Sequence, residues 1–358
     1  MMPLVETCAF ADVKWDLGGE VATGYDDNIS YVNTNRISDM VTHTSLGSGL
    51  TQQGKNDQFD IKAGLIENIY TNHSSYDNLQ EDLNADYTGD LNPYEHLKAS
   101  DIFTHSVDPS SLQNAFGRIN GSYGTYYNNL DLESATNITE HWTATLKYMQ
   151  TNYIFSTQSL SDSAGYNPEI SAEYDFSSQS QAKVSYDYRR RDFSPGGSSD
   201  ANTPTVGWRQ YLNTQWYMDV LGGVDFIRGF NEDLIKPRYG AGLTHDLDQN
   251  TRLTLKYDKQ YETDPYTQDI SNDWHLGLNG FHQFNSRING DVAVFTGQGK
   301  YVVSRISNKF IGTNVTLTYA INDHIDFSLT YGLVDSISSS DLRANKHNTV
   351  FAGIKYKF

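Results

Sequence analysis

The chain alternates apolar and polar residues from end to end, and this alternation constrains its fold more than any other feature. Successive side chains of a β-strand point to opposite faces, so alternation predicts strands with one apolar and one polar face. The C-terminal third shows the pattern best, where apolar Ile325, Phe327, Leu329, Tyr331 and Leu333 alternate with Asp326, Ser328, Thr330 and Gly332. Helical periodicity is nearly absent. The sequence therefore predicts an all-β fold.

The connections between the predicted strands alternate in length. Short turns are expected at Asn137–His141, Ser177–Gln181, Leu212–Gln215, Leu247–Asn250, Asn285–Arg287 and Asn322–His324. Longer polar loops are expected at Asp26–Arg36, Val107–Arg118, Ser156–Gly165, Ser194–Asn202, Thr263–Ser271 and Ser336–His347. This rhythm is typical of transmembrane antiparallel up-and-down β-barrels. We predict about 18 strands, within a range of about 16–18, with both termini periplasmic; residues 38–119 are the least regular.

Composition excludes several other classes of protein. The 26 basic and 44 acidic side chains give a net charge of −18, which argues against nucleic acid as a partner. Mean hydropathy is −0.58, and no apolar run approaches the roughly 20 residues of a membrane-spanning helix. The single cysteine, Cys8, allows no intrachain disulfide and no cysteine-based metal cluster.

A soluble β-sandwich would also alternate, and two features favour the membrane barrel over it. Aromatic residues concentrate at predicted strand ends, as in the interfacial girdles of outer-membrane barrels; they include Trp15, Trp142, Trp208, Trp216 and Trp274. The polar faces also carry many charged residues, which suit a wet lumen better than a packed interior.

The first eleven residues differ from the rest of the chain. Ala9-Phe10-Ala11 before Asp12 has the form of a signal-peptidase site, but a basic start is missing and Glu6 is present. We interpret residues 1–11 as a residual signal-peptide-like segment, with coincidence as an equal alternative, and residues 12–358 as a single outer-membrane β-barrel. Lipidation of Cys8 is disfavoured by the preceding Glu6-Thr7.

The C-terminal strand ends in Ile354 and Tyr356-Lys357-Phe358. This ending resembles the terminal signature of bacterial outer-membrane barrels, which implies that Phe358 and Tyr356 form an assembly signal for the barrel-assembly machinery. The segment Gly24–Ile29 resembles the opening motif of barrel porins found in exopolysaccharide-export loci. Residues 97–101, Asp108-Pro109 and Arg118-Ile119-Asn120 are similar to the middle of that family.

The resemblance implies an outer-membrane channel of Gram-negative bacteria that secretes an exopolysaccharide. Its expected partners are outer-membrane lipid, lipopolysaccharide, the barrel-assembly machinery and polysaccharide-export proteins. Two alternatives stay open: a structural sleeve for a multihaem cytochrome electron conduit, and a surface receptor or adhesin.

The sequence gives no support for catalysis, and we predict no enzyme activity, no metal site and no cofactor. The ten histidines form no H-E-x-x-H motif. His245-Asp246 could suggest a protease pair, although a strand residue beside a turn explains it better. Asp26, Asp27 and Asn28 could bind Ca²⁺ through oxygen ligands, but a solvated loop explains them equally well.

The charged residues in the polar phase of each strand are candidates for lining the pore. Acids in this phase are Asp16, Glu20, Asp60, Asp86, Glu169, Glu173 and Asp175; bases are Lys183, Arg189, Arg191, Arg209, Arg238, Arg252 and Lys256. One hypothesis places the acids and bases on opposed walls, with the arginines holding an acidic polymer weakly. The other hypothesis is that acids and bases form salt bridges that brace the wall.

Overall fold

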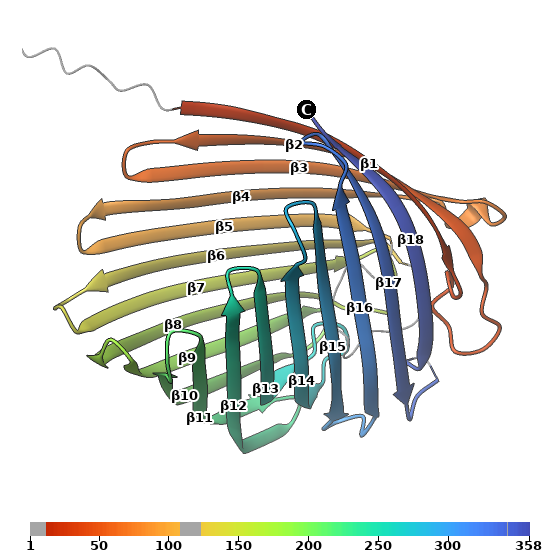
Figure 1. Cartoon of the computed structure of the whole chain (residues 1–358). Coiled ribbons are helices and arrows are strands. Elements are labelled where there is room, and N and C mark those ends of the chain that lie inside the picture. Colours follow the sequence, from red (N-terminus) through yellow and green to blue (C-terminus); the bar gives the residue numbers. More distant parts are fainter. Residues whose placement is uncertain (1–11, 108–122, 342) are drawn as a thin grey trace, which may run out of the picture.

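The computed structural model describes residues 12–107, 123–341 and 343–358, and nearly all of them lie in strands (Figure 1). The elements are β1 Asp12–Asp26, β2 Asp39–Gln53, β3 Asp57–Tyr70, the short 3-10 helix η1 Ser74–Tyr76, β4 Asn78–Asn92, β5 Glu95–Ser106, β6 Thr125–Asn137, β7 Trp142–Phe155, β8 Asp162–Ser177, β9 Ser180–Ser194, β10 Ser198–Tyr211, β11 Trp216–Gly229, β12 Glu232–Asp248, β13 Thr251–Thr263, β14 Ile270–Gln283, β15 Ile288–Tyr301, β16 Ser307–Ala320, β17 Ile325–Ser338 and β18 Asn345–Lys357.

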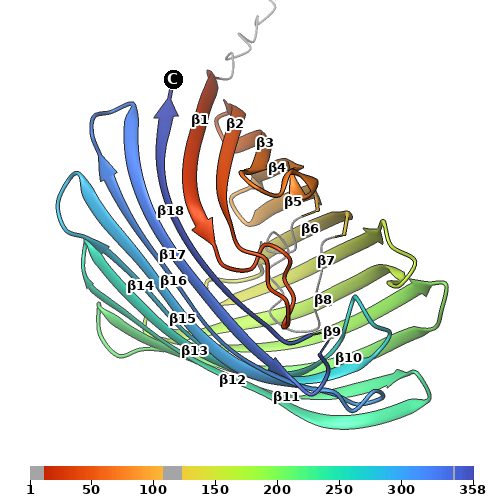
Figure 2. The same ribbon diagram turned by 90° about the vertical axis from the view of Figure 1, so that its right-hand side faces the viewer.

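The 18 strands form one closed antiparallel barrel. Each strand pairs with its neighbours in sequence, and β1 closes the sheet by pairing with β18 from Gly18↔Lys357 to Asp26↔Thr349. Figure 2 shows β1 and β18 side by side, with β17 and β16 following on from β18. The predicted fold class and strand number are confirmed. Within the described residues, no helix has the length and apolar character needed to cross a membrane.

The short turns predicted from the sequence lie at one end of the barrel, the end at which β1 begins and β18 ends. Two of the longer connections at the opposite end, 27–38 and 264–269, lie close to their predicted positions. The predicted residual signal-peptide segment 1–11 falls outside the described residues. So do most of the predicted loop Val107–Arg118 and the family-like Arg118-Ile119-Asn120.

Three predicted long loops are shorter than expected. The loop predicted at Ser194–Asn202 contains only residues 195–197, because Ser199 to Asn202 pair with both β9 and β11. The loops predicted at Ser156–Gly165 and Ser336–His347 shrink to 156–161 and 339–344. In each case polar strand ends beyond the apolar band were mistaken for loop.

One tight connection at the long-loop end was not predicted. Phe230 and Asn231 alone join β11 to β12, with φ values of 53° and 64°. Two successive residues in this left-handed region form the kind of turn that matches the twist of a β-hairpin. Phe230 is an unusual residue for such a turn, and its side chain packs against a buried cluster described below.

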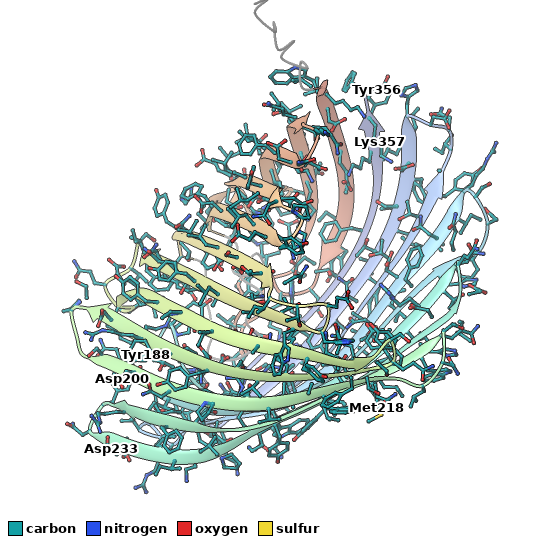
Figure 3. The ribbon with its side chains drawn as sticks, turned by 90° about the vertical axis from the view of Figure 1, so that its left-hand side faces the viewer. Tyr188, Asp200, Met218, Asp233, Tyr356 and Lys357 are labelled. Carbon is teal, nitrogen blue, oxygen red and sulfur yellow. The ribbon has the colours of Figure 1, made fainter. Side chains whose placement is uncertain are left out.

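The strand registers propagate one inner and one outer face around the barrel, and side chains project from both (Figure 3). On the outer face an exposed apolar band runs across neighbouring strands at Leu255, Leu278, Val294, Val315, Tyr331 and Val350. A closed barrel with an apolar outer band satisfies its backbone in lipid, where an open sheet cannot. The chain is therefore a multi-pass outer-membrane β-barrel.

Aromatic side chains border this band near both ends of the strands. Toward the short turns, Trp142 contacts Tyr174 and Trp216 stacks on His245. Trp274, toward the long-loop end of β14, stacks on Tyr257 of the outer face, which also stacks on Tyr239. Such pairs suit the two membrane–water interfaces, because an aromatic ring presents an apolar body and a polar edge.

The C-terminal residues have the geometry expected of a lipid-facing end. Tyr356 and Phe358 contact each other edge to face, with ring centroids 4.4 Å apart, and both are exposed on the outer side. The adjacent Lys357 points to the inner phase and pairs with Asp326 at 2.6 Å. Figure 3 labels Tyr356 and Lys357 at this end of the barrel. Their role as an assembly signal stays a prediction.

The outer band can be tested with two neighbouring residues of β13. Leu255→Arg puts a charge into the lipid-facing band and should destabilise the barrel by about 2–4 kcal/mol, whereas Thr254→Arg on the inner face should be nearly neutral. Urea unfolding of the two variants in detergent or liposomes measures the difference. Equal destabilisation would show that this strand presents the opposite face to lipid.

The orientation in the membrane is a second prediction. Because long loops of outer-membrane barrels face the outside, an epitope tag in loop 339–344 should be labelled on intact cells. The same tag in turn 249–250 should be labelled only after the outer membrane is opened. The opposite labelling pattern would contradict the predicted periplasmic termini.

Candidate functional site

The candidate functional site is the lumen, and all the candidate pore-lining side chains on β8, β9, β10, β12 and β13 lie in its inner phase. Arg238 and Lys256 line the main cavity directly. Arg209 stands across from Asp219, which also lines the cavity. The register pairs Gly207↔Lys183 and Lys183↔Glu173 show that Lys183 of β9 and Glu173 of β8 lie on the same inner face.

Most of the predicted basic residues are joined to carboxylates of the same wall. Lys183 lies 3.3 Å from Glu173 and 3.6 Å from Glu169. The other close pairs are Arg209–Asp219 and Arg252–Asp246, both at 2.6 Å. These pairs link inner-face residues of adjacent strands, so the basic stretch of the wall largely neutralises itself.

The hypothesis of opposed acidic and basic walls fails for the acids of β8. Because β8 pairs with β9, Glu169 and Glu173 lie beside Lys183 and not across the lumen from it. Asp175 is on the same strand and accepts a hydrogen bond from Gln181 at 2.9 Å. The arrangement matches the alternative hypothesis, in which charge pairs brace the wall.

Arg189 and Asp225 form the most buried of these pairs. Asp225 has 0% exposure and accepts from Arg189 Nη2 at 2.8 Å and from Thr203 Oγ1 at 2.7 Å. Its second oxygen accepts from the backbone N–H of Tyr261 at 3.1 Å. Arg189 Nη1 in turn donates to the Tyr261 carbonyl at 3.2 Å. Arg238 approaches Asp225 at 3.8 Å.

These contacts replace missing strand pairing. The ladder between β12 and β13 ends at Tyr239↔Lys259, although both strands continue toward the long-loop end. Beyond that point the Tyr261 backbone is bonded by the Asp225 and Arg189 side chains. A buried backbone group without a partner is costly, so this charge pair allows β13 to leave β12.

The end of β13 consequently lies inside the wall formed by β10 and β11. Tyr261 and Ile270, both in the outer phase of their strands, pack against Ala201 and Ile227 of the inner phase. Phe230, Leu234 and Val302 cover this cluster. The barrel is thus narrowed at its long-loop end by two layers of its own sheet.

Loop 264–269 extends this inward fold toward β7 and β8. Tyr266 packs on Tyr153 and Phe155 of β7, with ring centroids 5.8 and 5.6 Å apart. Ser163 Oγ donates to the Pro265 carbonyl at 3.2 Å, and Gln268 Nε2 donates to Ser161 Oγ at 2.8 Å. The loop therefore bridges two distant parts of the wall across the lumen.

Two aspartates anchor this loop. Asp269 accepts from the backbone N–H groups of Val303 and Ser304, both at 2.9 Å, which fixes loop 264–269 to loop 302–306. Asp264 lies 3.5 Å from Arg343 of loop 339–344. Burial raises the pKa of the Asp264 carboxyl, and the Arg343 guanidinium opposes that rise.

Arg191 differs from the other arginines of the inner phase. It donates to Ser163 Oγ and Thr151 Oγ1, both at 3.1 Å, and lies over the Tyr153 ring at 5.6 Å. It thereby supports the part of β7 and β8 against which Tyr266 packs. Because Arg191 lies over the ring of Tyr153, which Tyr266 also contacts, Arg191 helps to pack the narrowed part of the lumen.

A cavity of about 1310 Å³ lies beneath the inward-folded segments. It is bounded by β11–β18 and by the long-loop ends of β1–β3, with Asp264, Pro265 and Arg343 from the loops. Its lining in β13–β16 includes the acids Asp258, Glu262 and Asp273 and the rings of Phe295, Tyr301 and Phe310. Of the cavity-lining residues, sequence reasoning had singled out Arg238 and Lys256 as pore-lining candidates and Asp26 as a possible calcium ligand. The other acids and the rings carry no motif.

The weaker chemical candidates do not assemble into sites. His245 lies in the outer phase, stacked on Trp216 at 3.7 Å, whereas Asp246 pairs with Arg252 in the inner phase. Asp26, the last residue of β1, lies 2.8 Å from His347 Nε2, and Asn28 donates to the Lys346 carbonyl at 2.9 Å. These contacts tie the end of β1 and the start of loop 27–38 to β18. Among the described residues no group of three or more metal-binding side chains gathers.

No protein-family model matches the chain, and no curated protein matches it in sequence. Solved structures match it over nearly its whole length. OccAB4 of Acinetobacter baumannii has a TM-score of 0.52 and 11% identity, covering 98% of this chain and 99% of that chain. OccK2 (OpdF) of Pseudomonas aeruginosa, in complex with glucuronate, has a TM-score of 0.52 and 9% identity, covering 97% and 98%.

The siderophore receptor PirA of A. baumannii also has a TM-score of 0.52, at 8% identity. The match covers 96% of this chain and 80% of the receptor. At these identities the likeness concerns the fold alone. The structural neighbours include outer-membrane Occ and Opd porins, in agreement with the closed 18-stranded barrel.

Two arginines of the wall provide a matched test of the bracing pairs. Arg189→Gln removes the closer of the two guanidinium groups from the buried Asp225, leaving Arg238 at 3.8 Å, and should cost about 3–5 kcal/mol of stability. Arg209→Gln breaks a pair whose side chains are 44% and 41% exposed and should cost about 0–1 kcal/mol. Denaturant unfolding followed by tryptophan fluorescence measures both. Equal costs would contradict the special role of the buried pair.

Proposed function

We propose that this protein is an outer-membrane channel through which small polar solutes diffuse. The observation that carries the proposal is a polar, charged inner face that runs around a closed barrel of 18 strands. Barrels of 16–18 strands are wide enough to leave an aqueous path. The porin-like fold of the structural neighbours supports the same function.

The inward-folded segments define the size of solute that this channel would admit. The buried cluster around Tyr261 and the Tyr266 contact narrow the lumen at the long-loop end. A narrowed lumen favours compact solutes over bulky ones. Charged and polar side chains below the constriction can replace part of the water shell of a passing solute.

Secretion of an exopolysaccharide is a narrower proposal. It rests on the resemblance of Gly24–Ile29 and of the terminal strand to barrels from export loci. The hypothesis that unpaired arginines of one wall hold an acidic polymer lacks support. Arg189, Arg209 and Arg252 each pair with a carboxylate. The sleeve and receptor alternatives would require no conductance, which makes conductance the deciding measurement.

The channel proposal predicts stepwise ion conductance of the purified barrel in planar bilayers. Tyr266→Ala removes the aromatic contact that holds loop 264–269 against β7, so it should raise single-channel conductance and admit larger sugars in liposome swelling. Tyr94→Ala, in the exposed turn between β4 and β5, is the control and should leave both unchanged. A barrel that inserts but never conducts, with or without Tyr266, would refute the channel.

A further inference from the structure

The inner wall between β13 and β16 carries acids without matching bases. Asp258, Glu262 and Asp273 all line the cavity, and none of them takes part in an ion pair within the described residues. Gln260 stands across from Asp273, and Glu262 stands across from Ser271, so the three carboxylates occupy one patch of the sheet.

Nearby bases do not neutralise this patch fully. Arg343 is engaged with Asp264 and lies over the Tyr301 ring at 4.3 Å. Lys259 donates to Asn272 at 2.5 Å. Lys256 and Lys259 of β13 and Arg238 of β12 also line the cavity, and Arg238 lies 3.8 Å from Asp225. Six carboxylates of the lining thus face four lysine and arginine side chains, which leaves an excess of acidic groups.

Asp273 provides an independent indication of a ligand. Its residue exposure is 4%, and one carboxylate oxygen accepts from Ser271 Oγ at 2.6 Å. The other oxygen, Oδ1, has no hydrogen-bond partner among the described residues. A buried carboxylate oxygen without a donor is unfavourable, and a cationic donor in the cavity would satisfy it.

Aromatic rings flank the acids on the same inner face. Phe310 lies 5.7 Å from the His275 ring and 5.8 Å from the Phe295 ring. Gly297 stands between His275 and Phe310 in the register, so no side chain separates these two rings. Ring faces attract cations and cover apolar carbon, whereas they offer little to an anion.

We propose that this cavity binds a small organic cation, with an ammonium or guanidinium head at Asp273 and Glu262 and an apolar stem against Phe295 and Phe310. The inference rests on the proposed channel function, of which it specifies the solute class. Carboxylates supply charge-assisted hydrogen bonds to the head, and the rings supply contact area to the stem.

The remaining lumen favours the same class of solute. On the inner faces of β1–β8, carboxylates outnumber the lysines Lys14, Lys62, Lys98 and Lys147 even without Glu169 and Glu173, which pair with Lys183; they include Asp16, Glu20, Asp60, Asp82, Asp86, Asp90, Asp131, Glu133 and Asp175. A lumen of this sign concentrates cations and repels anions along the approach to the cavity.

The test uses agmatine, which carries a guanidinium head and an amine on an alkyl stem, and glutarate as an anion of similar length. Agmatine should bind the purified barrel in calorimetry and partly block its ion current, and glutarate should do neither. Asp273→Asn should weaken agmatine binding about ten-fold, equivalent to about 1.4 kcal/mol. Asp273→Glu should restore part of the affinity.

Asp291→Asn is the matched control, because Asp291 lies in the same inner phase of β15 as Phe295 but outside this cavity. An equal loss of affinity in Asp273→Asn and Asp291→Asn would overturn the site, since it would reflect the general charge of the lumen. Preference for glutarate would also overturn it. A barrel that conducts ions but does not bind agmatine would refute the cation site alone. A barrel that binds agmatine but does not conduct would refute the channel alone.

Discussion

The hydrogen bonds between β1 and β18 are the interaction on which the rest of the structure depends. Lipid offers no partner to a backbone N–H or carbonyl group, so a sheet can stay in the bilayer only when its first and last strands meet. The pairing from Gly18↔Lys357 to Asp26↔Thr349 meets this requirement. Once the sheet is closed, each strand has two neighbours. The polarity of alternate side chains then decides which face of the sheet meets lipid.

Closure alone does not produce an empty tube, because the sheet can fold its own strand ends inward. The β13 end does so only because Asp225 and Arg189 take over the Tyr261 backbone where β12 no longer reaches it. The charge pair is therefore a structural element as much as a lumen residue. It links the inward position of the β13 end to a buried ion pair.

The alternation was sufficient to predict the fold, since a barrel in lipid sorts residues by face with a period of two. It also placed Lys183, Arg209 and Arg252 in the inner phase. Their partners could not be predicted, because the register between neighbouring strands decides which acid a base meets. Asp225 stands in clear alternation with Val224 and Phe226, but its burial follows from the inward β13 end, for which the sequence has no local signal. Polar strand ends such as 198–202 were mistaken for loop because the apolar band stops below them.

The distribution of charge around the lumen follows from these pairings. Bases on β9, β10 and β13 pair with acids of the adjacent strand, and Arg189 of β9 reaches Asp225 of β11, so that stretch of wall presents little net field. Acids on β1–β8 and in the cavity have fewer such neighbours, and the lumen as a whole is left negative. Since unpaired charge acts over a longer range than a closed ion pair, the cation preference proposed above rests on the acids without partners. The arginines, although prominent in the sequence, mainly form ion pairs that brace the barrel wall.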